Sequence, residues 1–187
     1  MLKPPFSRSD LNKIFSDTSS RTLRSWIDAG MVEWAGEARD GRGVHRLFED
    51  WNLYQIGIVI RLASLHFPLS FIKTLMEDHF MGKEHGRPRI VNKIDKVLII
   101  AIRGKDLSDP AYFTELCSEE DMPSKLNDIF EKYRPHYKAN GEPVLLGRSG
   151  PKPPSPSTVI IINLPDIADG VRHLIETANV KNEKKIN

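Results

Sequence analysis

The feature that most constrains the fold is a pair of short amphipathic helices separated by a polar break. In the first segment the apolar side chains share one helical face, at Leu11, Ile14 and Phe15. Residues 17–19 then form the polar break. A second helix is predicted over residues 19–29, and Gly30 stands where a left-handed residue often ends a helix. Two helices joined in this way have the outline of a helix-turn-helix.

The segment after Gly30 predicts a wing. Residues 36–48 contain a glycine-rich turn between arginines, followed by a short apolar run that ends at Phe48. A hairpin with a basic tip directly after the second helix is typical of a winged helix-turn-helix. Two more helices are expected, from Asp50 to Leu65 and from Ser70 to Met76, with a break at His66–Pro68 between them.

Three stretches of this region form a pattern of motifs: Ser20–Trp26 with Ala29–Met31, then Gly43–Phe48, then His66–Ile72. In this order they resemble the MerR family of transcriptional regulators. Each motif alone is weakly specific, but together they keep the order and spacing of the family over roughly the first 77 residues. The resemblance implies a winged helix-turn-helix that binds double-stranded DNA, with residues 1–80 as the DNA-binding domain.

The resemblance also implies which side chains contact DNA. The first turn of helix 19–29 would reach base edges in the major groove, where arginine bonds guanine with two hydrogen bonds. Wing 36–48 would lie on the DNA backbone. The expected DNA-binding residues are Ser20, Arg21, Thr22, Arg24, Trp26, Arg39, Arg42, His45 and Arg46.

Two qualifications apply to this set. Leu23, Trp26 and Leu47 are expected on the inner side, although the indole N–H of Trp26 could still donate to a phosphate. Acidic residues are interleaved among the arginines, for example Asp28 and Glu33. The alternative that these arginines only form an ordinary solvated surface therefore stays open.

The chain departs from the family after the fourth helix. MerR regulators usually continue there into a long helix that forms an antiparallel dimer coiled coil. Here Gly82, Gly86 and Pro88 interrupt that place, and no apolar heptad runs through it. The family's usual mode of dimerisation is therefore not expected.

Residues 90–180 predict a second, small α/β domain, so the expected fold class is α+β. Val97–Ile102 and Thr158–Ile162 are apolar, β-branched runs typical of buried strands. Helices are expected over Asp109–Leu116, Pro123–Tyr133 and Asp166–Ala178, and residues 181–187 form a polar tail. Because two buried strands lack neighbours within one chain, we expect the sheet to be completed in a homodimer through this domain.

Composition narrows the class of protein. The net charge of the 187 residues is only +2, so the placement of charges matters more than their sum. The single cysteine, Cys117, excludes an internal disulfide and a zinc finger, and no apolar stretch is long enough for a membrane span. A cytoplasmic, nucleoid-associated protein with no membrane partner is expected.

No group of residues predicts an active site. Asp78, His79, Glu84 and His85 match no common zinc pattern and are interpreted as a solvated helix end. No nucleophile, base and acid stand in a defensible arrangement. The expectation is a protein that is not an enzyme, with no catalytic residue, no metal ligand and no cofactor.

The sequence therefore predicts sequence-specific binding of double-stranded DNA, with transcriptional regulation as the leading function. The domain at 90–180 would dimerise, or sense an effector or partner protein of unknown identity. The alternative is a DNA-organising or packaging adaptor, such as a chromosome-anchoring or phage protein, that uses the same winged helix. A regulator would occupy a few operators and an adaptor many sites, so genome-wide mapping of bound sites separates the two.

Overall fold

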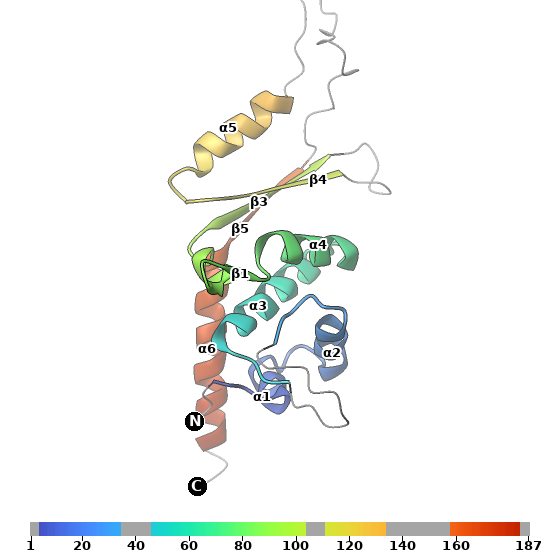
Figure 1. Cartoon of the computed structure of the whole chain (residues 1–187), viewed down its shortest axis with the longest axis vertical. Helices are drawn as coiled ribbons and strands as arrows, with labels where there is room; N and C mark the ends of the chain where they lie inside the picture. Colours follow the sequence, from blue (N-terminus) through green and yellow to red (C-terminus); the bar gives the residue numbers. More distant parts are fainter. Residues whose placement is uncertain (1–3, 35–45, 104–110, 134–157, 184–187) are drawn as a thin grey trace, which may run out of the picture. The chain divides into compact units, whose positions relative to one another are not determined.

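The computed structural model describes residues 4–34, 46–103, 111–133 and 158–183 (Figure 1). The fold combines α-helices with two small β-sheets and is therefore α+β, as expected. The chain divides into two compact units. Unit 1 contains residues 1–94 together with 164–187, and unit 2 contains residues 95–163.

Unit 1 is built mainly from helices. They are α1 (Arg8–Ile14), α2 (Ser20–Asp28), α3 (Asp50–Ser64), α4 (Leu69–His79) and α6 (Leu164–Glu183). A small hairpin of β1 (Lys83–Glu84) and β2 (Arg87–Pro88) follows α4 and leads into the short 3-10 helix η1 (Arg89–Asn92). The first four helices lie close to the ranges that the apolar periodicity predicts.

Side chains at the helix ends explain where α1 and α2 begin and end. Ser7 and Asp10 form a reciprocal capping box, in which the Asp10 N–H donates to Ser7 Oγ and the Ser7 N–H donates to the Asp10 carboxylate. Gly30 follows α2 with a φ of 76°, the left-handed conformation that glycine adopts without strain. The predicted end of the second helix is thereby confirmed.

Backbone pairing joins the segment before α1 to the segment before α3. Phe6 and Phe48 form an antiparallel bridge, with N···O distances of 2.6 and 2.9 Å. Both phenyl rings are fully buried. The bridge joins the entry to α1 with the segment that precedes α3. Leu47, which the sequence analysis placed in the core, is 37% exposed, so this expectation was wrong: Phe48 is the residue that points inward.

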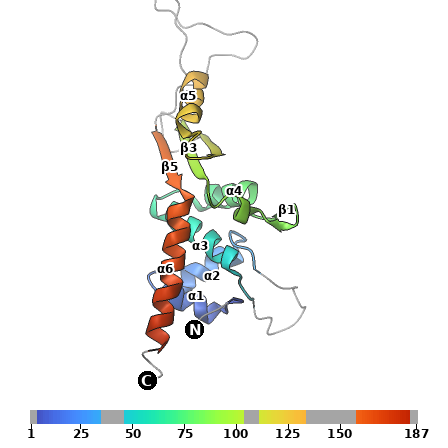
Figure 2. The same ribbon diagram turned by 90° about the vertical axis from the view of Figure 1, so that its left-hand side faces the viewer.

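Helix α6 packs against α3 and α1 within unit 1 (Figures 1 and 2). The approach is closest at Gly57 of α3, where an added Cβ would lie 2.8 Å from Ile167 Cγ2 and 2.9 Å from Val171 Cγ2. A side chain at position 57 would therefore push the two helices apart. The expected domain 90–180 is revised accordingly, because its last helix belongs to the unit that contains α1 to α4.

Unit 2 is a three-stranded antiparallel sheet with one helix. Strand β3 (Val97–Arg103) lies between β4 (Ala111–Cys117) and β5 (Thr158–Asn163), and α5 (Met122–Tyr133) follows β4. The buried side chains of its core are Val97, Ile99, Ala101, Cys117 and Ile129, with Phe113, Met122, Leu126 and Val159 packed against them. The predicted strands at 97–102 and 158–162 and the helix at 123–133 are confirmed.

Two expectations about unit 2 were wrong. Residues 111–116, expected to be helical, form strand β4, because their aromatic and β-branched side chains favour a strand and β3 pairs along their whole length. The two predicted strands also do not lack neighbours, since β3 pairs with β4 on one side and β5 on the other. This removes the reason for completing the sheet in a dimer.

Among the described residues, no helix is both long and apolar enough to cross a lipid bilayer. Part of the predicted polar tail, residues 181–183, is the last turn of α6.

Candidate nucleic-acid interface

The first turn of α2 presents polar side chains to solvent. Ser19 caps the helix: its Oγ accepts a hydrogen bond from the Thr22 N–H at 3.1 Å and lies 2.8 Å from the Thr22 hydroxyl. Ser20 and Arg21 are exposed, whereas Thr22 is half-buried. Because the cap holds the Thr22 hydroxyl, Ser20 and Arg21 are the side chains of this turn that are most available to an external partner.

The opposite face of α2 belongs to the core. Leu23 and Ile27 are buried, and Trp26 is only 7% exposed. The expected core position of Leu23 and Trp26 is confirmed. Trp26 is therefore removed from the candidate DNA contacts, because an indole enclosed by the core offers no surface to a phosphate.

Asp28, at the end of α2, accepts hydrogen bonds from two arginines. Its Oδ2 lies 3.3 Å from Arg24 Nε, one turn earlier on the same helix, and its Oδ1 lies 2.5 Å from Arg46 Nη1. The hydrogen bond from Arg46, together with that from Arg24, keeps the pKa of the Asp28 carboxyl below its usual range. The guanidinium carbon of Arg46 also stands 4.5 Å from the centre of the Trp34 ring, a cation–π contact.

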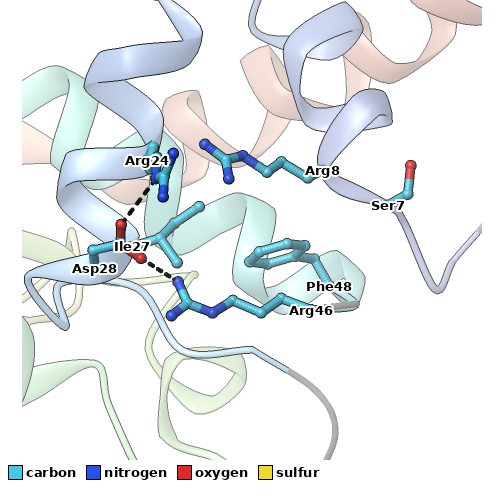
Figure 3. Close-up of a pocket in the computed structure, with 7 residues that line it drawn as sticks. All are labelled: Ser7, Arg8, Arg24, Ile27, Asp28, Arg46 and Phe48. Carbon is cyan, nitrogen blue, oxygen red and sulfur yellow. Dashed lines mark hydrogen bonds and ion pairs between the residues drawn. The ribbon is translucent and has the colours of Figure 1, made fainter. Parts of the chain in front are cut away.

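These side chains border a hollow of about 360 Å³ (Figure 3). The residues around it are Ser7, Arg8, Arg24, Ile27, Asp28, Arg46 and Phe48. Arg8 from α1, Arg24 from α2 and Arg46 reach toward the same space from three segments of the chain (Figure 3). Three guanidinium groups against one carboxylate give the hollow a local excess of two positive charges. Such a hollow can accept an anion.

A buried polar network holds the segment after α2 in place. The Glu33 N–H donates to Gln55 Oε1 at 3.0 Å, and Gln55 Nε2 donates to the Glu33 carboxylate at 2.9 Å and to the Phe80 carbonyl at 3.2 Å. Asn52 Nδ2 donates to the Glu33 carbonyl at 2.8 Å. Asn52 and Gln55 are fully buried. The network fixes Glu33, and with it the neighbouring Trp34, against α3 and the end of α4.

The structure brings only part of the expected set together. Arg24 and Arg46 meet at the hollow, whereas Ser20 and Arg21 stand exposed on the first turn of α2. Arg39, Arg42 and His45, and most of the predicted wing at 36–48, lie outside the described residues. The predicted contacts of these wing residues stay predictions.

Sequence reasoning missed Arg8, Asp28 and Gln55. Arg8 had a usable signal, because the Ser7 and Asp10 capping box starts α1 at Arg8 and fixes where its side chain leaves the helix. Asp28 was recognised only as an interleaved acid. Gln55 stands within an apolar stretch, between Leu53 and Ile56, and a polar residue there signals a buried hydrogen-bond network.

The polar residues near the end of α4 do not assemble into a metal site. No group of three or more potential metal ligands occurs among the described residues. His85 instead forms, with Gly86, the left-handed turn of the small hairpin, with φ values of 52° and 77°. Burial, together with the positive charge of Lys93, lowers the pKa of His79.

Comparison with protein-family models and with curated protein sequences gives no match for this chain.

Proposed function

We propose that this protein binds double-stranded DNA in a sequence-specific manner, as a transcriptional regulator. The observation that carries the proposal is the exposed first turn of α2 on the same helix that supplies Arg24 to the basic hollow. An α-helix fits the major groove, and arginine at its N-terminal end reads guanine through O6 and N7. A basic hollow beside such a helix suits a backbone phosphate, which would fix the register of the helix on the duplex.

The first test is selection of bound sequences from a random duplex pool with the full chain. Enrichment of a common motif is expected, with binding to that motif about 10³-fold or more tighter than to a scrambled duplex at physiological salt. Equal binding to both duplexes would show that the protein binds DNA without sequence specificity. An absence of binding to any duplex would overturn the proposal.

Replacing Arg21 by alanine should remove a base contact. The expected cost is about 1–3 kcal/mol of binding free energy on the selected site, with relaxed preference at one base position. Fluorescence anisotropy with the selected duplex and its single-base variants measures both effects. Arg61→Ala is a matched control, because Arg61 is also an exposed helical arginine but lies in the last turn of α3. Equal losses in the two variants would contradict base reading by Arg21.

Replacing both Arg39 and Arg42 by alanine should weaken binding to all sequences about equally, because the wing is proposed to contact phosphates. The slope of log K against log salt concentration should become shallower by about one to two units if each arginine neutralises one phosphate. Titrations at several salt concentrations give the slope. A loss confined to one sequence would show that the wing reads bases instead.

The proposal extends to partners. Helix-turn-helix proteins that read inverted repeats carry two reading heads about one helical turn of DNA apart, or a multiple of it. We therefore keep the homodimer through unit 2 as a proposal, now argued from the edges of its sheet, since its two predicted strands do not lack neighbours. The described strands that border this sheet are β4 and β5. Sensing of an effector or of a partner protein by unit 2 is part of the same proposal.

A further inference from the structure

We infer that Asp28 is an internal competitor of DNA: its carboxylate occupies Arg24 and Arg46 in the free protein, and a DNA backbone phosphate takes its place in the hollow. This inference rests on the proposed function and adds a residue that limits its affinity. Asp28 is the acidic side chain among the residues around the hollow, and it contacts two of the three arginines there.

The contacts of Asp28 resemble those of a bound phosphate. Each of its two oxygens accepts from a different guanidinium group, Oδ2 from Arg24 and Oδ1 from Arg46. A phosphodiester also presents two charged oxygens, and arginine binds both kinds of anion with the same donors. A phosphate that enters the hollow therefore meets arginines that are already neutralised in part by a carboxylate.

The arginines do not need Asp28 to stay in place. Arg46 stacks on the Trp34 ring and lies two residues before Phe48, whose backbone is paired with Phe6. Arg24 is anchored by the α2 backbone, between the buried Leu23 and Trp26. Asp28 itself has a side chain that is 44% exposed, and exposed ion pairs of this kind contribute little to positioning or to stability. The main effect of Asp28 on DNA binding is therefore competition for the two arginines and not their positioning.

Coulomb's law gives the expected change in DNA affinity when the Asp28 charge is removed. A guanidinium and a carboxylate about 4 Å apart in water attract each other by an energy that corresponds to roughly a fivefold change in affinity, and a phosphate that displaces Asp28 must first break this pairing. Removing the Asp28 charge should therefore tighten DNA binding about fivefold. The salt slope should also steepen by up to about one unit, because the freed arginines neutralise more of one phosphate.

The test compares Asp28→Asn with Asp169→Asn in the full chain. Asp169 is a matched control: it is an exposed helical aspartate paired with an arginine three residues away, Arg172, but it lies on α6 and is absent from the hollow. Both variants raise the net charge by one. We expect Asp28→Asn to tighten binding about fivefold and Asp169→Asn to change it less than twofold. Equal changes, or weaker binding by Asp28→Asn, would overturn the inference.

A double-mutant cycle with Arg46 separates competition from general repulsion. If Asp28 acts by occupying Arg46, the gain from Asp28→Asn should shrink in an Arg46→Ala background. A gain that persists unchanged in that background would show that Asp28 only repels DNA at a distance. Thermal unfolding of each variant checks the fold, and Asp28→Asn is expected to unfold at the wild-type temperature.

Two further comparisons identify the source of the phosphate and separate failure of this inference from failure of the proposed function. Free phosphate should weaken DNA binding relative to chloride at equal ionic strength if a backbone phosphate occupies the hollow, because both anions bind the same guanidinium groups, and Asp28→Asn should enlarge this loss. Equal DNA binding in the two salts, with inorganic phosphate still bound by the protein, would assign the hollow to a free ion instead. If the wild-type chain binds no duplex, the proposed function fails. If it binds and Asp28→Asn matches its control, only the competitor role fails.

Discussion

A chain that ends at Ile94 is expected to lose most of its stability, although it contains all of α1 to α4. Without α6, the face of α3 around Gly57 is left without its covering helix. The buried residues of α6 include Leu164, Ala168, Val171 and Ala178. Each larger apolar side chain that loses its burial costs about 1.5–3 kcal/mol. Two or three such losses are comparable with the total stability of a small domain, about 5–15 kcal/mol.

Urea unfolding of residues 1–94, followed by circular dichroism beside the full chain, measures this effect. A peptide of residues 164–183 added in trans should restore helical signal and stability, whereas the same peptide with Val171→Asp should not. Val171 is the control position because it is buried and faces Gly57. A 1–94 fragment as stable as the full chain would contradict the prediction. This expectation also revises the boundary of the DNA-binding domain that the sequence analysis gave at residues 1–80, because α6 belongs to the same unit.

Replacing Gln55 by leucine is expected to cost about 2–6 kcal/mol of unfolding free energy. The substitution keeps the side-chain size but leaves the Glu33 N–H and the Phe80 carbonyl without their partner, and each unsatisfied group costs about 1–3 kcal/mol. The Glu33 carboxylate also loses a donor, although it keeps the Gly82 N–H at 3.0 Å. Urea titration gives the free energy.

The matched control is Asn12→Leu, which makes a similar amide-to-leucine change at an exposed position of α1. A change there should stay within about 0.5 kcal/mol of wild type. Similar stability of the two variants would show that the network around Glu33 contributes nothing. A large loss in both would point to a general effect of leucine rather than to unsatisfied groups.

Local patterns in the sequence were sufficient to predict most of the helices of unit 1. The apolar periods of α1 to α4 and the cap at Gly30 depend on neighbours along the chain, and these were read correctly. The side-chain direction at Leu47 and Phe48 was not, because it depends on pairing between Phe48 and Phe6, which are distant in sequence. The candidate site shows the same division, since the position of Arg24 on its helix follows from the sequence, whereas its meeting with Arg8 at the hollow depends on the fold.

The errors in unit 2 have a related cause. Asp109 and Pro110 resemble a helix start, and this local signal led to the prediction of a helix at 109–116. The pairing of Ala111–Cys117 with β3 outweighs it, because seven consecutive pairs form along the strand. The packing position of α6 was also not predicted. Its own sequence predicts a helix, but the surface that it covers lies around Gly57, which is distant in the sequence.

The position of α6 has a consequence for synthesis on the ribosome. The 69 residues of unit 2, from 95 to 163, are translated after α4 and before the helix that completes unit 1. At about 5–20 residues per second, synthesis of unit 2 alone takes roughly 3–14 seconds, during which the surface around Gly57 stays uncovered. Nascent or prematurely terminated chains therefore lack a finished unit 1, and a chaperone that binds apolar helices would find its target there. DNA binding, as proposed, would then be restricted to chains translated through α6.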